Sequence, residues 1–266
     1  MKLIASIVLC CAMPALLASQ WVKYPTAGVP LGPNGKPNLS APVPRTPEGK
    51  PDFSGIWQGE NEPCPPGGCL DMQSSKEFLN IGARLPGGLP YQPWAAELVK
   101  QRMAENGKDD PVSHCRPAGA LRLFTYPPYR KIVQTPGLVV ILSERDVTYR
   151  QIFTDGRPLP KDPEPSFTGY STGHWEGDTL VVQTNGFRDG MWLDRSGSPM
   201  TDAAKMTERF RRINYGNLEV EVTVDDPKAY TKPWTVTLRQ FIVLNQELLD
   251  YFCEDNERDL PHLVGK

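Results

Sequence analysis

Hydrophobic and polar residues alternate along a series of short segments that fills the second half of the chain. β-Branched and aromatic residues dominate each segment, and turn-forming residues separate it from the next. This pattern predicts an all-β domain whose antiparallel strands form a barrel or a sandwich, with one or two short helices. The segments are KIVQT, LVVILSE, VTYRQIF, GYSTGHWE, DTLVVQTNG, MTERFRRI, NLEVEVTV, WTVTLRQFIVL and ELLDYFC.

One helix is expected before these strands, over residues 93–106. Pro93 suits a first helical position, and Gly107 follows the last residue. The apolar residues that should share one face of this helix are Trp94, Leu98 and Met103.

The stretch STGHWEGDTLVVQT predicts a β-hairpin with a two-residue turn at Gly177-Asp178. This turn pairs Glu176 with Thr179, and side chains then alternate between the two faces. Trp175, Leu180 and Val182 share one face. The other face carries Tyr170, Thr172, His174, Val181, Gln183 and Asn185.

A second hairpin is expected over residues 205–224, with a three-residue loop at positions 215–217. This register pairs Arg211 with Glu221, whereas a slip of one residue would turn every side chain to the opposite face. Glu208 and Arg212 then lie on the apolar stripe of the sheet. The other members of that stripe are Phe210, Leu218, Val220, Val222 and Val224.

Glu208 and His174 are the candidate catalytic residues. A carboxylate inside a sheet is costly unless it is paired or hydrated, so Glu208 is either a pocket acid or base, or half of an internal salt bridge to Arg212 or another arginine. His174 either titrates near neutral pH in a pocket wall, or lies on the surface, or ligates a metal together with Glu176. Of these possibilities, a metal site is the one we do not expect, because the neighbouring sequence offers no third ligand.

The chain ends indicate an exported protein. Residues 1–19 have a basic start, an apolar run and small residues typical of a signal peptide, and the two cysteines within the run raise a lipoprotein signal as an alternative. Residues 20–50 are rich in proline and glycine and predict a flexible arm. Residues 51–266 are expected to form a single barrel-like domain in the periplasm or outside the cell.

The charge pattern and the length of the apolar runs argue against nucleic-acid binding and against a membrane-spanning helix. The net charge is −2 with both signs mixed along the chain, and no basic stripe suggests nucleic-acid binding. No apolar run reaches the roughly 18 residues that a membrane-spanning helix needs. A small-molecule ligand or substrate is the partner we expect, with no cofactor.

Four cysteines follow the signal segment, and an exported chain favours their pairing into disulfides. Cys64 and Cys69 can close on each other, which leaves Cys115 for Cys253. A zinc site is the alternative, although four-thiolate sites usually show two close cysteine pairs.

Two resemblances add to these expectations. Gly55-Ile56-Trp57 is similar to the Gly-x-Trp at the start of lipocalin barrels. The motifs GHWEGDTLVV, TERFRR and DDPKAYTKPWTV resemble a family of exported bacterial proteins without an established activity. These resemblances imply export and a single β-rich domain, and they imply no reaction.

Three functions remain open from the sequence. The first is a small-molecule lyase, isomerase or hydrolase, in which His174 and Glu208 exchange protons while Tyr170 and Arg212 bind the substrate; Gln183 and Trp57 would complete the pocket. The second is a lipocalin-like binding protein for an apolar or aromatic ligand. The third is a structural cell-envelope protein. An enclosed pocket joining His174 to Glu208 would favour the enzyme, an apolar pocket the binding protein, and a filled interior the structural protein.

Overall fold

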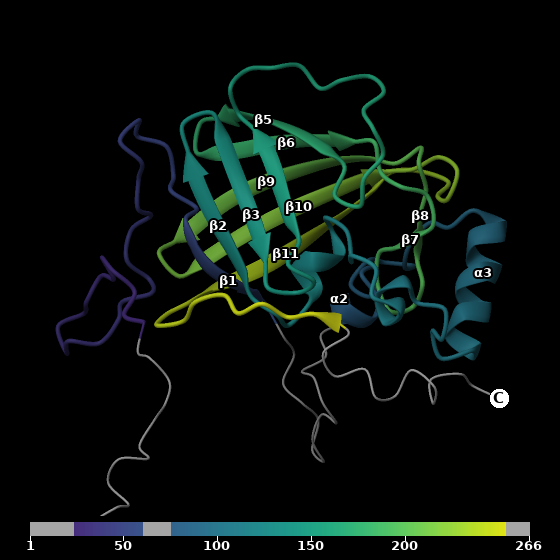
Figure 1. The fold of residues 1–266 in the computed structure, drawn as a ribbon, viewed down its shortest axis with the longest axis horizontal. Helices are drawn as coiled ribbons and strands as arrows, with labels where there is room; N and C mark the ends of the chain where they lie inside the picture. The colour runs from purple at the N-terminus through teal and green to yellow at the C-terminus, as the bar shows by residue number, and fades with distance from the viewer. Residues whose placement is uncertain (1–23, 61–75, 254–266) are drawn as a thin grey trace, which may run out of the picture.

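The computed structural model describes residues 24–60 and 76–253 and contains a closed β-barrel of nine strands (Figure 1). This architecture confirms the predicted all-β class. Around the barrel the order is β1 (Gly55–Gly59), β11 (Trp234–Val243), β10 (Asn217–Asp225), β9 (Lys205–Asn214), β6 (Thr179–Asn185), β5 (Tyr170–Glu176), β4 (Tyr149–Phe153), β3 (Leu138–Ser143) and β2 (Arg130–Thr135), which returns to β1.

Packed side chains fill the barrel because every second residue of each strand points inward. Phe53 enters from the side of the N-terminal arm and Phe124 from the opposite side, and both rings contact Phe210, at centroid distances of 6.2 and 5.9 Å. The filled interior provides the hydrophobic core of the domain. Its buried members include Trp57, Ile132, Ile141, Ile152, Leu180, Val182, Val220, Val222 and Leu238.

The first hairpin has the predicted register, with Glu176 opposite Thr179 and His174 opposite Val181. The predicted register of the second hairpin is wrong by two residues: Arg211 pairs with Glu219, not with Glu221. The turn is shorter than expected, and an irregularity next to it adds one unpaired residue to β9. Because the total shift is two residues, every side chain keeps its predicted face.

One neighbouring pair of strands differs from all the others. β4 and β5 run parallel, and only two residue pairs join them, Ile152 with Ser171 and Phe153 with Thr172. A parallel pair needs a long connection, which residues 154–169 provide. The strands therefore separate before Ile152, and this pair has the fewest paired residues in the barrel.

The N-terminal arm closes one end of the barrel, and hydrogen bonds join its described part to the barrel. Backbone hydrogen bonds join Tyr215 to the carbonyl of Ala41 and Gly216 to that of Leu39. The side chains of Thr26 and Asn245 accept backbone hydrogen bonds from each other's residues. Hydrogen bonds to the barrel, and not a periodic apolar face, therefore hold the described part of the arm in place.

Helices and short strands cover the other end of the barrel (Figure 1). They are α2 (Lys76–Leu79), α3 (Pro93–Ala104), the 3₁₀ turns Pro111–His114 and Arg122–Thr125, and the ribbon of β7 (Met191–Trp192) and β8 (Pro199–Met200). α3 starts at Pro93 as predicted and ends two residues early, but the predicted face is wrong: it buries Ala95 and Val99. Trp94 and Met103 are 48% and 56% exposed.

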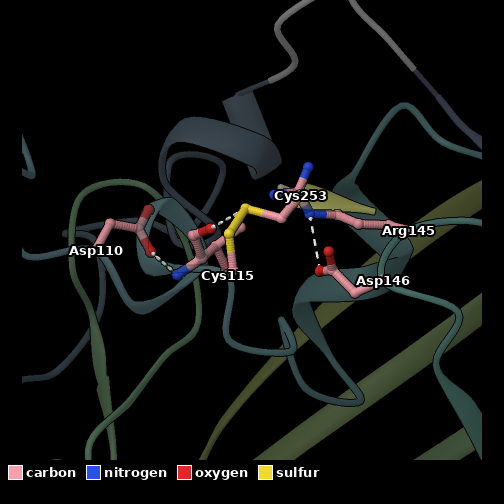
Figure 2. Close-up of a disulfide and its surroundings, with 6 residues drawn as sticks. Asp110, Cys115, Arg145, Asp146 and Cys253 are labelled. Atoms are coloured by element: carbon pink, nitrogen blue, oxygen red, sulfur yellow. Dashed lines mark hydrogen bonds and ion pairs between the residues drawn. A yellow bond between two sulfur atoms is a disulfide. The ribbon is translucent and has the colours of Figure 1, made fainter. Parts of the chain in front are cut away.

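The C-terminal segment returns along the outside of β2 and β3 instead of forming the expected last strand. Lys131 Nζ binds Glu247 at 2.6 Å, and the backbone of Tyr251 bonds to Glu144 and Asp146. The segment ends in the predicted disulfide between Cys115 and Cys253, with a Cα–Cα distance of 5.3 Å (Figure 2).

The Cys64–Cys69 pairing, a metal site and a membrane-spanning helix are judged only on the residues that the structure describes. Cys64 and Cys69 lie outside the described ranges, so their pairing stays a prediction. Within residues 24–60 and 76–253, no group of three or more His, Cys, Asp and Glu residues is arranged to hold a metal ion. A search of the same residues for a helix long and apolar enough to cross a membrane finds none.

Loss of the disulfide should destabilise the fold, because Cys115 and Cys253 are 138 residues apart and their bond restricts the unfolded chain. We expect Cys115→Ser to lower the free energy of unfolding by roughly 3–5 kcal/mol in a urea titration. Under reducing conditions the wild type and the variant should have the same midpoint. Equal stability of oxidised and reduced wild type would contradict this account.

Candidate functional site

Glu208 lies inside the barrel, as predicted, and forms an ion pair with Arg150 of β4. Glu208 Oε1 accepts a hydrogen bond from Arg150 Nη1 at 2.8 Å, and Oε2 accepts one from Nη2. Arg150 also donates to Ser171 Oγ at 3.1 Å and to Thr184 Oγ1 at 2.8 Å. All four residues are buried, so this network joins β4, β5, β6 and β9 through the core.

This geometry supports the salt-bridge interpretation of Glu208, with Arg150 as the partner in place of Arg212. Both carboxylate oxygens are occupied by one guanidinium, and the neighbours across the sheet, Val182 and Val222, are apolar. A buried ion pair of this kind is stable only while both partners are present. Glu208 is therefore a structural residue of the core.

His174 lies on the outside of the barrel and does not meet Glu208. Its side chain is 61% exposed, and its Nε2 lies 3.3 Å from Glu176 Oε1. Arg209 of β9 donates to the other oxygen of Glu176 at 2.8 Å. The surface interpretation of His174 therefore agrees with the structure, and a shared His174–Glu208 pocket does not.

Arg212 and Trp57 form the closed end of the barrel beneath the arm. The guanidinium lies 4.9 Å from the centre of the Trp57 ring and donates to the carbonyls of Asp52, Asn214 and Tyr215. Burial lowers the pKa of Arg212 to about 10, so the group remains charged at neutral pH. Since three carbonyls hold it, Arg212 secures the turn and the arm.

The two remaining predicted site residues lie in separate depressions of the outer surface. Gln183 lines a depression of about 560 Å³ beside Lys161 and Lys205. Tyr170 lines a groove of about 390 Å³ between β4 and β5. The predicted residues thus do not form one site, because alternation along a strand fixes a face but not which strands become neighbours.

A depression of about 510 Å³ lies beneath the arm and is lined by Arg212, Tyr215 and Ile242. The β4/β5 groove is smaller, but its aromatic lining makes it the candidate site, and it lies where the parallel strands separate. Its aromatic residues are Tyr149, Phe153, Phe167 and Tyr170. Phe153 and Tyr170 are stacked at 5.3 Å, and Arg157 lies 3.9 Å above the Phe153 ring. The full lining is Pro117, Val147, Thr148, Tyr149, Gln151, Phe153 and residues 166–171.

Two further properties distinguish this groove. Its lining contains aromatic, aliphatic, hydroxyl and amide side chains but no Asp, Glu, Lys, Arg, His or Cys. At its rim Val147 has a φ of 46°, which is a strained conformation for a β-branched residue. Tyr149 and Val147 are 63% and 52% exposed, so apolar surface is available to a ligand.

Sequence reasoning missed Tyr149, Gln151, Phe153 and Phe167 as site residues. In the segment VTYRQIF every second side chain lies on the same face of the strand, so the sequence does place Tyr149, Gln151 and Phe153 together. The pattern does not reveal that this face borders a gap in the sheet, since the other wall comes from residues 166–171.

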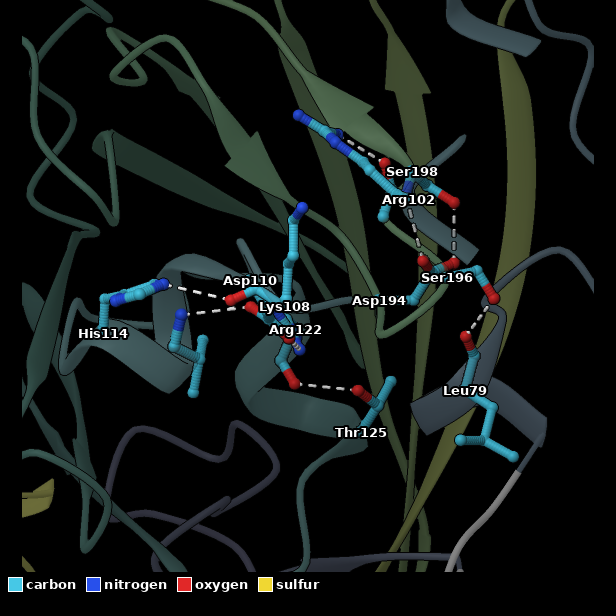
Figure 3. Close-up of polar contacts among 12 residues, drawn as sticks. Leu79, Arg102, Lys108, Asp110, His114, Arg122, Thr125, Asp194, Ser196 and Ser198 are labelled. Atoms are coloured by element: carbon cyan, nitrogen blue, oxygen red, sulfur yellow. Dashed lines mark hydrogen bonds and ion pairs between the residues drawn. The ribbon is translucent and has the colours of Figure 1, made fainter. Parts of the chain in front are cut away.

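A second polar cluster lies in the helical cap and has a structural arrangement (Figure 3). Asp194 accepts hydrogen bonds from the backbone N–H groups of Ile81 and Ser198 and from Ser198 Oγ, as a turn residue does. Asp110 and Arg122 form a buried bidentate ion pair with distances of 2.7 and 2.5 Å. These contacts hold the cap segments together.

His114 also lies at the edge of this cap. Its Nε2 is 3.1 Å from the carbonyl of Lys108, and the residue is exposed. The neighbouring Cys115 is bound in the disulfide with Cys253. A Cys–His nucleophile is thereby excluded, because a sulfur in a disulfide is not a thiolate.

Comparison with known proteins assigns no family to the chain. No protein-family model matches it, and no curated protein matches its sequence. The lipocalin-like Gly55-x-Trp57 and the likeness to exported bacterial proteins therefore stay predictions. The function has to be inferred from the geometry of the site.

The buried ion pair generates a prediction about stability. Glu208→Gln leaves the Arg150 charge buried without its partner, so we expect the free energy of unfolding to fall by about 3–5 kcal/mol. Denaturant titration measures this change. His174→Ala is the control and should leave stability nearly unchanged.

The double variant Arg150→Met with Glu208→Leu tests the same point from the other side. Replacing both charges with apolar side chains removes the unpaired charge, so stability should recover most of the loss. Wild-type stability in Glu208→Gln alone would show that the ion pair does not hold the barrel.

The cap also predicts an alkaline transition. Burial raises the pKa of Tyr91, whose hydroxyl lies 2.7 Å from Ser198 Oγ, to about 12. The unfolded state releases this proton near pH 10, so the stability contributed below that pH is lost as the pH rises toward 12. We expect Tyr91→Phe to show a shallower fall of melting temperature above pH 10. Tyr149→Phe, on the exposed wall, serves as the control and should match wild type.

Proposed function

We propose that this protein is an exported binding protein whose small, uncharged ligand has a flat apolar face and lies in the β4/β5 groove. The observation that carries the proposal is the aromatic lining of that groove at the parallel seam. The volume of about 390 Å³ falls within the range of roughly 300–1,000 Å³ found for small-molecule sites.

A preformed platform supports binding. Asp155 holds Arg157 through contacts of 2.6–3.0 Å, and Arg157 in turn covers Phe153 and reaches the hydroxyl of Tyr170 at 3.4 Å. Behind the wall, the Arg150 network fixes β4 to its neighbours. Rigid walls reduce the ordering cost of binding, which favours affinity.

The chemistry of the groove supports binding over acid–base catalysis. Apart from the tyrosine hydroxyls, its lining has no side chain suited to proton transfer near neutral pH. The two candidate catalytic residues lie elsewhere, with Glu208 in the core and His174 on another part of the surface. An acid–base enzyme at His174 and Glu208 therefore lacks geometric support.

The filled interior bears on the remaining alternatives. A lipocalin-like ligand would need space inside the barrel, where Phe53, Phe124 and Phe210 are packed together. A filled interior was the feature expected of a structural cell-envelope protein. The aromatic groove on the wall is what distinguishes a binding protein from that alternative.

The test is native mass spectrometry of the protein purified from the periplasm or culture medium of the organism that produces it. We expect a bound small molecule in wild type and its loss in Tyr149→Ala, because that change removes an exposed wall of the groove. Phe241→Ala, at a similarly exposed outer position on β11, should retain the ligand. A ligand retained equally by both variants would place binding outside the groove.

A further inference from the structure

The β4/β5 groove combines aromatic faces with free hydrogen-bonding groups. Among the described residues, no hydrogen bond engages the side chains of Tyr149, Gln151, Ser166 or Thr168, although all four line the groove. Each of these side chains both donates and accepts hydrogen bonds. The groove therefore presents four neutral polar groups around an aromatic platform.

The open edge of β4 adds backbone groups to this set. Pairing with β5 begins only at Ile152, so the earlier residues of β4 have no ladder partner on the side of the groove. In a strand, alternate residues direct their N–H and C=O groups to each side. A ligand in the groove can therefore bind backbone as well as side-chain groups.

We infer that the ligand of the β4/β5 groove is a neutral saccharide of one or two rings, an inference that rests on the proposed binding function. A sugar ring has a flat face of C–H groups that packs against an aromatic ring, and its rim carries hydroxyl groups. The exposed Tyr149 ring, together with the Tyr170 ring that stacks on Phe153, provides the surface for that face. The polar side chains of the lining provide partners for the hydroxyl rim.

Desolvation favours a sugar over a purely apolar aromatic molecule. An apolar ligand would remove water from the groove without replacing its hydrogen bonds, which is unfavourable for each polar group left unsatisfied. A sugar replaces those bonds with its own hydroxyl groups. With four such groups in the lining, this difference favours the sugar.

The charge of the lining selects neutral sugars over acidic or phosphorylated ones. No lysine or arginine lines the groove. Two guanidinium groups lie against its aromatic rings: Arg157, which is paired with Asp155, and Arg188, which donates to the carbonyl of Pro165. A carboxylate or phosphate on the ligand would lose its hydration without gaining a cationic partner in the lining. Neutral hexoses and N-acetylated hexosamines are the class that fits.

The experiment is a titration of the full chain with cellobiose, maltose and N,N′-diacetylchitobiose, followed by saturation-transfer NMR and calorimetry, with indole as a neutral aromatic probe. We expect at least one disaccharide to bind and Tyr149→Ala to weaken it by about tenfold or more. Phe241→Ala should bind as wild type does.

Gln151→Leu separates the two ligand classes. This change removes hydrogen-bonding groups from an exposed position of the groove but keeps the size of the side chain, so it should weaken disaccharide binding by about fivefold. Indole binding should be unchanged or tighter. Gln183→Leu makes the same change on β6, outside the groove, and should affect neither probe.

The outcomes distinguish the inference from the proposed function. If indole binds and Tyr149→Ala abolishes its binding while no disaccharide binds, the groove is a binding site and the saccharide class is wrong. If neither indole nor any disaccharide binds, the proposed function and the inference both fail. They also fail if Tyr149→Ala binds indole and the disaccharides as tightly as wild type does. Equal disaccharide affinity of Gln151→Leu and wild type would also overturn the saccharide inference.

Discussion

The barrel depends on the buried ion pair between Arg150 and Glu208. It connects β4 to β9 across the β4/β5 pair, which has the fewest paired residues in the barrel. The hydroxyl groups of Ser171 on β5 and Thr184 on β6 extend the network to the two strands between them. A charge in this position cannot be hydrated, so each partner fixes the other. The groove on the outer wall keeps its shape because the strand behind it is anchored from inside.

This anchoring explains why the candidate site lies on the wall and not within the barrel. The arm and the helical cap fill the two ends, and Arg212 stacked on Trp57 completes the arm side. The interior is then a core in the ordinary sense, whose packing stabilises the domain. The exposed aromatic residues beside the β4/β5 pair offer a ligand apolar contact on the outer wall.

Prediction from the sequence succeeded where a local rule decides the outcome. Alternation correctly placed Glu208 inside, and the Gly177-Asp178 turn correctly set the register of its hairpin. The second register failed because an irregularity beside a short turn has no clear sequence signal. The helix face also failed, since contacts with the cap made Ala95 and Val99 the buried side.

The site itself was beyond local rules. Arg150 follows Tyr149 in an alternating segment, and nothing nearby indicates that it reaches Glu208 across the core. The groove depends on segments 149–153 and 166–171 lying beside each other without pairing over most of their length. Which segments become neighbours depends on how the whole sheet closes, and that is not a local property of the sequence.

The closure itself has a consequence that follows from counting. In a ring of strands whose directions strictly alternate, only an even number can return to the starting direction. Nine strands must therefore contain a like-directed pair somewhere, and in this protein it falls between β4 and β5. No point substitution can remove that mismatch, because only the gain or loss of an entire strand would restore alternation. The opening beside the pair is thus a topological property of the chain, which evolution can line with new side chains but cannot easily erase.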